Sequence, residues 1–543
     1  MRAHRALGPA RGNEVSGGLM ASTSAGRRGT RRRAAAGLLV VPLLVAVGCS
    51  RSGEDAVAKG PGSGGGGPAA TGTKDGKAPV GSGAPGDFGT LKDVCGKGDG
   101  KPLTKKADRG VTEKQISVSV TGDPNAPAQP GLGKEFFEMA DGFTKWCNGL
   151  GGINGRTIKL TQRDAALSNV GTVMTAACQS DFMVVGGGNP FDNDGVKART
   201  GCKLGAFPAY VVGEESAKAD LQVLAVGLPT TTTVVGAYKA VFAARPEVKA
   251  KVGLLGQNMA SLRPAMARYK AGVEAAGGTV VFKEDVPVMP PPGRTTLEKM
   301  KQAGVEMLIT TWLAVDSASM FREMDAMNWH PKVIVSDASA YNRYTLASAK
   351  NSKIPDTYIY PTYVPQSLGD KNPAVQKALE ILHLAEPSKD LEFFHMSGIN
   401  SWLLWASAVK ECGTELTTEC VLAKGKRANW DAGGLFAPGP IVETKDVRAS
   451  DCFTMVKATA KGFEYDAALT KPNKAEFFNC DPANVVAVAP GAPSAPPPSA
   501  PATTPPAGEA TAPPATGDPG TGNPPPADGG EPPPAAPPEE VTS

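Results

Sequence analysis

Short apolar runs alternate with amphipathic stretches through the middle of the chain, from about residue 111 to residue 481. The first run, Ile116–Thr121 (ISVSVT), predicts a buried strand, and Lys134–Leu150 predicts a helix with its aromatic residues on one side. The elements predicted after these two are a strand at Thr157–Gln162, a helix at Asn169–Cys178, and strands at Phe182–Val185, Leu204–Phe207 and Val223–Val226. Strands that alternate with helices in this way indicate βαβ units and a parallel sheet.

A second series of the same kind follows. Its predicted strands are Lys251–Gly256, Thr279–Lys283, Met307–Thr311 and Lys332–Ser336, and the helices between them are Ser261–Ala276, Thr295–Ala303 and Asp316–Met327. Beyond residue 361 the pattern predicts two helices and a late strand, namely Pro373–Ala385, Phe393–Lys410 and Cys452–Ala458. Two series in tandem predict an α/β protein with two doubly wound lobes, whose ligand crevice lies at the carboxyl ends of the parallel strands.

Composition separates both ends of the chain from this folded part. The chain has 65 Gly and 48 Pro, and many of them fall in two terminal segments that cannot bury a core. We therefore expect residues 50–108 to be a flexible linker and residues 486–543 to be a disordered tail rich in Pro and Ala. The tail could meet the cell wall or a partner, or it could be a solvated segment without a binding role.

The first 49 residues have the pattern of an export signal. Five arginines between residues 27 and 33 precede the apolar stretch Ala34–Val47, which is shorter than the roughly 20 residues that a spanning helix needs. The stretch ends at Cys49, after Ala46-Val47-Gly48, and this resembles the bacterial lipobox, although the family prefers Leu where Ala46 stands. We expect lipid attachment at Cys49 and a place on the outer face of the cytoplasmic membrane. The alternative is an ordinary secretory signal followed by a chance cysteine.

Charge and motifs argue against several other functions. The net charge of +4 comes from the N-terminal arginines, and the folded part has no basic stripe interleaved with aromatic residues, so we expect no nucleic-acid partner. The four histidines show no metalloprotease spacing, and neither a nucleophile elbow nor a phosphate-binding loop occurs. Gly186-Gly187-Gly188 follows a strand but lacks the spacing of a dinucleotide-binding loop. We therefore predict a protein that is not an enzyme and uses no cofactor or metal.

The turn Gly151–Arg156 (GGINGR) lies directly after a predicted helix and before the second strand. With this turn and its tandem architecture, the chain resembles the type I periplasmic binding proteins, specifically the branched-chain amino-acid-binding receptors of ABC transporters. The resemblance implies a hinge with three crossings of the chain between the lobes. Lobe 1 would comprise residues 109–232 and about 362–428, and lobe 2 would comprise residues 233–361 and about 429–485.

Nine cysteines are present. Without Cys49, the predicted site of lipid attachment, an even set of eight is left, which in an exported protein indicates disulfides. The resemblance implies bridges at Cys178–Cys202 and Cys412–Cys420. For the other four cysteines we expect Cys452–Cys480 and Cys95–Cys147, among the 105 connectivities that eight cysteines allow.

The family binds its solute between the lobes, through backbone and hydroxyl groups at strand ends and an acid that holds an amino group. Carried over to this sequence, the resemblance implies the ligand-binding residues Thr121, Gly188, Asn189, Tyr210, Asn258, Trp312 and Asp337. Each of these positions has a structural alternative: Thr121 and Asn189 suit turns or caps, Tyr210 and Trp312 suit a core or rim, and Asp337 suits a helix cap near Ala338.

Two loops depart from the family pattern and bear on the solute. Thr121–Pro130 is longer than the usual Thr-Gly-Pro loop, and Asn189–Asp192 (NPFD) replaces the Ser- and Thr-rich residues that grip an amino-acid carboxylate. Three alternatives to an amino acid follow: a different small polar or aromatic solute, a larger ligand, or the loss of ligand binding.

The first functional hypothesis is a monomeric, lipid-anchored receptor that delivers a small polar solute, an amino acid or a related compound, to an ABC permease. The alternative is a sensory or envelope-structural lipoprotein that keeps the fold without transport. An extracellular hydrolase is disfavoured, because no nucleophile–base pair is evident.

Overall fold

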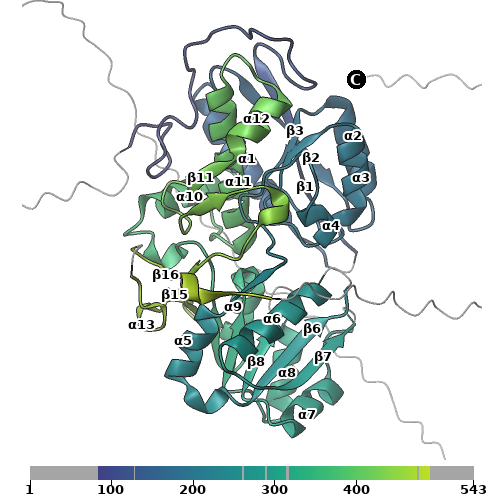
Figure 1. The fold of residues 1–543 in the computed structure, drawn as a ribbon, viewed down its shortest axis with the longest axis vertical. Helices are drawn as coiled ribbons and strands as arrows, with labels where there is room; N and C mark the ends of the chain where they lie inside the picture. The colour runs from purple at the N-terminus through teal and green to yellow at the C-terminus, as the bar shows by residue number, and fades with distance from the viewer. Residues whose placement is uncertain are drawn as a thin grey trace, which may run out of the picture. The chain divides into compact units, whose positions relative to one another are not determined.

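The computed structural model describes residues 83–127, 129–259, 262–287, 290–312, 317–473 and 476–488 (Figure 1). The predicted export signal, Cys49 and the tail beyond residue 488 lie outside the described residues. No helix in the described ranges is long and apolar enough to cross a membrane.

Lobe 1 is built on a four-stranded parallel sheet with the strand order β2-β1-β3-β4. Its strands are β1 (Gln115–Gly122), β2 (Thr157–Asp164), β3 (Met183–Val185) and β4 (Gly205–Phe207), and its first helices are α1 (Lys134–Gly149), α2 (Val170–Ser180), α3 (Asn193–Gly201) and α4 (Glu214–Ala217). The helix α1 buries Phe136, Met139 and Phe143 completely or nearly so. This apolar side attaches the helix to the core, and its removal from water stabilises the lobe.

Lobe 2 contains a seven-stranded sheet with the order β15-β14-β10-β9-β8-β6-β7. The parallel strands are β6 (Val252–Gln257), β7 (Val280–Val286), β8 (Met307–Thr310), β9 (Val333–Ser336) and β10 (Asp356–Ile359), and the strands β14 (Val456–Thr459) and β15 (Gly462–Tyr465) run antiparallel at one edge. The helices of this part are α5 (Gly236–Ala244), α6 (Arg263–Ala275), α7 (Arg294–Gln302), α8 (Ala318–Ala326), α9 (Arg343–Asn351) and α13 (Ala467–Thr470). The strands β6, β8 and β9 are buried at every position, as expected for parallel strands covered on both faces.

The chain returns to lobe 1 after β10 and leaves it again before β14. The returning elements are α10 (Pro373–His383), α11 (Phe393–Cys412), α12 (Thr418–Gly425), β11 (Arg427–Trp430) and β12 (Gly439–Ile441). The helices α10 and α11 pack against α1. Near the end of the described chain, β13 (Cys452–Phe453) pairs with β16 (Asn479–Cys480), and β17 (Val485–Ala487) pairs with β5 (Thr232–Val234). The predicted α/β fold with two parallel-stranded lobes is thus confirmed, and the chain passes between the lobes three times.

Two predicted strands differ in the structure. Residues Val223–Val226 form no strand, and the nearest pairing is a single bridge between Ala206 and Gln222. The predicted strand Cys452–Ala458 is interrupted, because Cys452–Phe453 pairs with β16 and the chain then turns into the edge of the large sheet. An apolar run alone does not show whether a neighbouring strand is available for pairing.

Three segment boundaries also differ from those expected. Residues 83–108 pack on lobe 1, where Phe88 and Val94 are buried, so this part of the expected linker belongs to the folded part. Residues 429–441 contact lobe 1, since the indole nitrogen of Trp430 donates a hydrogen bond of 2.7 Å to Oδ1 of Asn400 in α11. Val486 and Ala487 pair with β5 and therefore belong to the folded part.

The structure joins the eight remaining cysteines in the pairs Cys95–Cys147, Cys178–Cys202, Cys412–Cys420 and Cys452–Cys480. These are the pairs expected from the sequence. The first of them ties the N-terminal strap, residues 83–108, to α1, and the indole nitrogen of Trp146 adds a hydrogen bond of 3.2 Å to the carbonyl of Pro85.

Candidate functional site

The loop after β3 is packed so tightly that it requires glycine. Gly186 has a φ of +74°, and a Cβ atom there would lie 2.1 Å from the indole nitrogen of Trp402. A Cβ at Gly187 would lie 2.3 Å from the carbonyl oxygen of Thr121, and one at Gly188 would lie 2.7 Å from that of Tyr210. The three glycines therefore bring the ends of β1, β3 and β4 together, which is a role in close backbone packing.

These strand ends border a small cavity in lobe 1. Its lining includes all four residues predicted from lobe 1, namely Thr121, Gly188, Asn189 and Tyr210. Apolar side chains of Met174, Val184, Val196 and Val211 form another part of the lining. The lining thus combines apolar side chains with a few polar residues.

The charged residues of this cavity are bonded within the protein. The carboxylate of Asp192 accepts hydrogen bonds from the backbone nitrogens of Val212 and Gly213, at 2.8 and 2.9 Å. The guanidinium of Arg199 donates to three backbone carbonyls and to the side chain of Gln222. Burial raises the pKa of Asp192 to about 6 and lowers the pKa of Arg199 to about 10. Neither group offers a free charge to a solute.

Asn189 is bonded within the protein as well. Its side-chain nitrogen Nδ2 donates a hydrogen bond of 2.9 Å to Oδ2 of Asp123, whose other oxygen accepts from the backbone nitrogen of Leu167 at 2.7 Å. Burial raises the pKa of Asp123, so the hydrogen bonds compensate only part of the desolvation. Asn189 therefore helps to fix this loop, and its contact with a solute stays a prediction.

The three residues predicted from lobe 2 do not line this cavity. Asn258 is exposed, and its Oδ1 accepts a hydrogen bond of 2.9 Å from Arg263. Trp312 is buried, and its indole nitrogen lies 3.4 Å from the carbonyl of Gly256. Asp337 caps the 3₁₀ helix Ala338–Ala340 through a hydrogen bond of 2.9 Å from the backbone nitrogen of Ser339.

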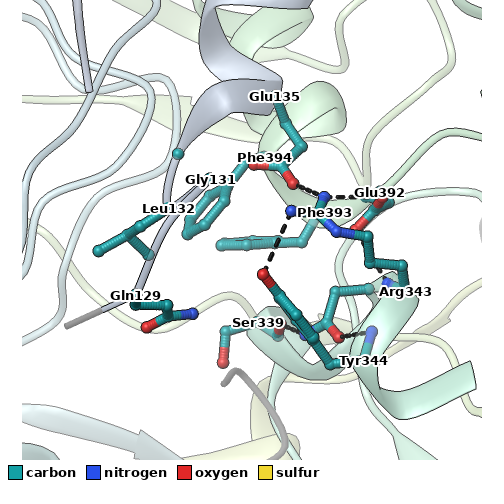
Figure 2. A pocket seen from close by; sticks show the side chains of 12 residues that line it. Gln129, Gly131, Leu132, Glu135, Ser339, Arg343, Tyr344, Glu392, Phe393 and Phe394 are labelled. Carbon is teal, nitrogen blue, oxygen red and sulfur yellow. Dashed lines mark hydrogen bonds and ion pairs between the residues drawn. The ribbon is translucent and has the colours of Figure 1, made fainter. Parts of the chain in front are cut away.

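A second small cavity lies between the lobes (Figure 2). Lobe 1 contributes the loop before α1 and Glu135, lobe 2 contributes Ser339 and the start of α9, and the start of α11 completes the lining. Arg343 of α9 forms ion pairs with Glu135 and, at 3.3 Å, with Glu392, as the dashed lines in Figure 2 show. Burial lowers the pKa of Arg343, but the charges of Glu135 and Glu392 outweigh this effect and raise it. This group of charges connects the two lobes directly.

Aromatic rings lie between the two cavities. Tyr210, which lines the first, packs edge-on against Phe393 and Phe394, which line the second, with ring centroids 5.6 and 5.4 Å apart. Phe394 also packs against Phe136 at 4.6 Å. Burial raises the pKa of Tyr210, and the charge of Asp337 raises it further, so its hydroxyl is neutral and can donate a hydrogen bond.

Sequence reasoning missed the interlobe residues Glu135, Arg343, Glu392 and Phe393. They come from three distant segments of the chain, and no local motif marks them. Among the described residues, no group of three His, Cys, Asp or Glu side chains is placed to hold a metal ion.

The geometry is that of a two-lobed binding protein, and a comparison with protein families supports this. A family model described as periplasmic binding protein matches residues 115–463, more than half of the chain. The chain belongs to this family. Periplasmic binding proteins of this type deliver small solutes to the permeases of ABC transporters, and the predicted resemblance to the type I group is confirmed.

Solved structures of other periplasmic binding proteins share the fold. A fatty acid ABC transporter substrate-binding protein from Thermomonospora curvata is 18% identical over 68% of this chain and 97% of its own, with a TM-score of 0.52. A solute-binding protein from Rhodopseudomonas palustris BisB5, in complex with 3,4-dihydroxybenzoic acid, is 15% identical over 65% and 95%, with a TM-score of 0.53. A branched-chain amino acid ABC transporter protein from Thermus thermophilus, with bound valine, is 14% identical over 66% and 98%, with a TM-score of 0.52. No curated protein matches the sequence significantly.

Proposed function

We propose that this periplasmic binding protein is a lipid-anchored receptor that holds a small solute between its lobes and presents it to an ABC permease. The observation that carries the proposal is the cavity at the strand ends of lobe 1, because it brings together Thr121, Gly188, Asn189 and Tyr210. Crevices at the carboxyl ends of parallel strands are the usual ligand sites of such folds. The solute is bound and released unchanged.

The solute class follows from the lining and from the relatives. The first cavity is lined by apolar side chains together with Thr121 and Tyr210. The similar structures are named for a fatty acid transporter or contain a dihydroxybenzoic acid or valine, and these compounds share a carboxyl group and an apolar body. Such compounds are therefore the first candidates.

A thermal-shift screen of the purified full-length protein in detergent tests the receptor function. The panel contains amino acids, amides, fatty acids, aromatic acids and sugars. A solute at a concentration of 100 times its dissociation constant should stabilise the folded state by about 2.7 kcal/mol. A response to one class establishes the receptor, whereas a flat response across the panel favours the sensory or structural alternative, for which the long Pro- and Ala-rich tail is the supporting observation.

The lipid anchor needs a separate experiment. A Cys49→Ser variant cannot carry a thioether-linked lipid, so we expect it to leave the membrane fraction and to enter the aqueous phase in detergent partitioning. The unchanged protein should remain with the membrane. If both proteins partition alike, the anchor is absent and the segment acts as an ordinary export signal.

A further inference from the structure

The folded chain continues beyond residue 463, where the match to the family model ends. Residues 479–488, the C-terminal segment, follow α13 of lobe 2 and pair with strands near the crossings between the lobes. β16 pairs with β13, and β17 pairs with β5. The C-terminal segment is thus an addition to the part of the chain that the family model describes.

β17 lies antiparallel to β5 in the first crossing, which is the segment between α4 of lobe 1 and α5 of lobe 2. Backbone hydrogen bonds continue the pairing at both ends of β17. The nitrogen of Val235 donates a bond of 2.7 Å to the carbonyl of Asn484, and the nitrogen of Val488 donates one of 2.9 Å to the carbonyl of Thr231. The pairing therefore covers the crossing from residue 231 to residue 235.

The same segment is fixed to the third crossing, which lies between β12 of lobe 1 and β14 of lobe 2. The disulfide Cys452–Cys480 joins the two covalently. The backbone nitrogen of Asp481 donates a hydrogen bond of 3.1 Å to the carbonyl of Asp451, and Nδ2 of Asn484 donates one of 2.9 Å to the same carbonyl. The C-terminal segment therefore binds two crossings at once.

Helix α5 of lobe 2 holds the segment in place from another direction. Nζ of Lys239 donates a hydrogen bond of 3.2 Å to the carbonyl of Ala483. The packing at the start of α5 is close, since a Cβ atom at Gly236 would lie 2.4 Å from Oδ1 of Asn484. The segment is therefore attached to lobe 2 as well as to the crossings.

Two lobes that move about a hinge do so through backbone rotations in the segments that connect them. Thr232 and Thr233 of the first crossing are almost completely buried, and Oγ1 of Thr232 accepts a hydrogen bond of 2.8 Å from the backbone nitrogen of Ala449 in the third crossing. A rotation at these residues would either break the backbone bonds to β17 or displace β17. The disulfide and the two bonds to Asp451 oppose such a displacement.

We propose that the C-terminal segment is a clasp on the hinge, which narrows the range of motion between the lobes. It acts through backbone pairing and a disulfide within the chain, so it restrains the lobes with or without a solute. The proposal therefore goes beyond the receptor function and is tested without a ligand.

Proline substitutions in β17 test the clasp, because proline lacks the backbone N–H. Hydrogen-bonded pairs alternate along an antiparallel ladder, and the bonds at the two ends of β17 place the pair of Val486 with Thr233 among them. Val486→Pro therefore removes a bond of the clasp. Ala487→Pro is the matched control, because the pair of Ala487 with Thr232 is a non-hydrogen-bonded one.

Two truncations form a second matched pair. A chain that ends at Ala483 lacks β17 and the tail, whereas a chain that ends at Val488 lacks the tail alone. The distance between the lobes is measured in solute-free protein in detergent by double electron–electron resonance. Spin labels are attached through p-acetylphenylalanine at the exposed positions of Lys197 in α3 and Lys301 in α7, so that all cysteines stay in place.

The distribution of interlobe distances should be broader in Val486→Pro and in the chain that ends at Ala483 than in the unchanged protein. Ala487→Pro and the chain that ends at Val488 should match the unchanged protein. Equal distributions in all of these proteins would overturn the proposal. So would a lower unfolding temperature of Val486→Pro with an unchanged distribution, because the segment would then only stabilise the fold.

Hydrogen exchange provides a test that does not depend on the folding of a variant. In the unchanged protein, the amides of Val235 and Val488 should exchange slowly, since each donates to a carbonyl of the paired strand. In Val486→Pro, peptides that cover residues 231–235 should exchange about 3-fold to 10-fold faster. Exchange of these amides in the unchanged protein at the rate of an unstructured peptide would show that the clasp does not form, and would overturn the proposal.

Discussion

The side-chain nitrogen of Asn189 donates a hydrogen bond of 2.9 Å to Oδ2 of Asp123, and both residues are almost completely buried. The bond joins the loop after β3 to the loop after β1, which are 66 residues apart in the sequence. It fixes the two loops that border the cavity of lobe 1, so that this wall of the cavity exists before a solute arrives.

Removal of this bond should therefore destabilise the protein. Asn189→Ala leaves a buried carboxylate oxygen of Asp123 without its partner, and we expect a loss of about 1–3 kcal/mol in the free energy of unfolding. Denaturant titration measures the loss, with the exposed Asn351→Ala as control, which should change stability by less than about 0.5 kcal/mol. Equal effects of the two changes would show that the bond to Asp123 contributes nothing.

The glycines of the same loop give a second prediction. In Gly187→Ala, the new Cβ would lie 2.3 Å from the carbonyl oxygen of Thr121 and 2.5 Å from its nitrogen. Backbone atoms of a central strand cannot move aside without loss of pairing, so we expect a lower unfolding temperature and weaker solute binding. Gly201→Ala, at the end of α3, meets no atom within 4 Å and should be neutral or stabilising by about 0.5–1 kcal/mol. A tolerated Gly187→Ala would contradict the packing role of this loop.

The sequence predicted the fold well because the signal for it is local. The periodicity at β1 and α1 predicted both elements within two residues of their ends. It failed at Val223–Val226, where the apolar run has no neighbouring strand, and at Phe88 and Val94, which are buried although they lie in a segment rich in Gly and Lys. Those outcomes depend on tertiary contacts, which composition does not report.

The candidate site was predictable only in part, and for a related reason. Strand ends can be located from the sequence, and the four site residues predicted at or near strand ends of lobe 1 do line one cavity. The partners of a side chain cannot be located in this way, so neither the bond of Asn189 to Asp123 nor the bond of Tyr269 to Asp337 was predicted.

The buried Glu138 in α1 predicts how stability depends on pH. Its carboxylate lies 3.1 Å from Nε2 of His395 and 3.2 Å from Nζ of Lys134, and it also pairs with Lys389. Burial raises its pKa, but these partners outweigh that effect and lower the pKa to about 2, from 4.5. Because the pKa in the folded state is the lower one, the stabilisation is complete above pH 4.5 and is lost as the pH falls toward about 2.

We therefore expect Glu138→Gln to lower the free energy of unfolding at pH 7 by roughly 3 kcal/mol. The difference from the unchanged protein should shrink as the pH falls below 4.5 and should nearly vanish at the lowest pH at which both proteins fold. Denaturant titration across this range measures it, and Glu464→Gln, an exposed change on β15, is the control. A difference that is independent of pH would show that the effect of the substitution is one of packing.

The last prediction concerns the ion pair of Arg343 with Glu135, which joins α9 of lobe 2 to α1 of lobe 1. The side chain of Glu135 is only 5% exposed, so a carboxylate left there without Arg343 would be unpaired in a buried place. Arg343→Gln should lower the free energy of unfolding by about 1–3 kcal/mol, and should weaken solute binding because the arrangement of the lobes that the pair stabilises becomes less populated.

A double-mutant cycle with Glu135→Gln isolates the contribution of the pair. If the two side chains act together, the double variant should be less destabilised than the sum of the single variants, by about 0.5–3 kcal/mol. Lys270→Gln is the control, because it also removes a cation, and Lys270 pairs with Glu274 at 2.5 Å within α6 of lobe 2. Loss of that exposed pair should lower the free energy of unfolding by at most about 0.5 kcal/mol and should leave solute affinity unchanged. Additive losses in the cycle, together with unchanged solute affinity in Arg343→Gln, would mean that the contact between the lobes does not contribute to the state that binds the solute.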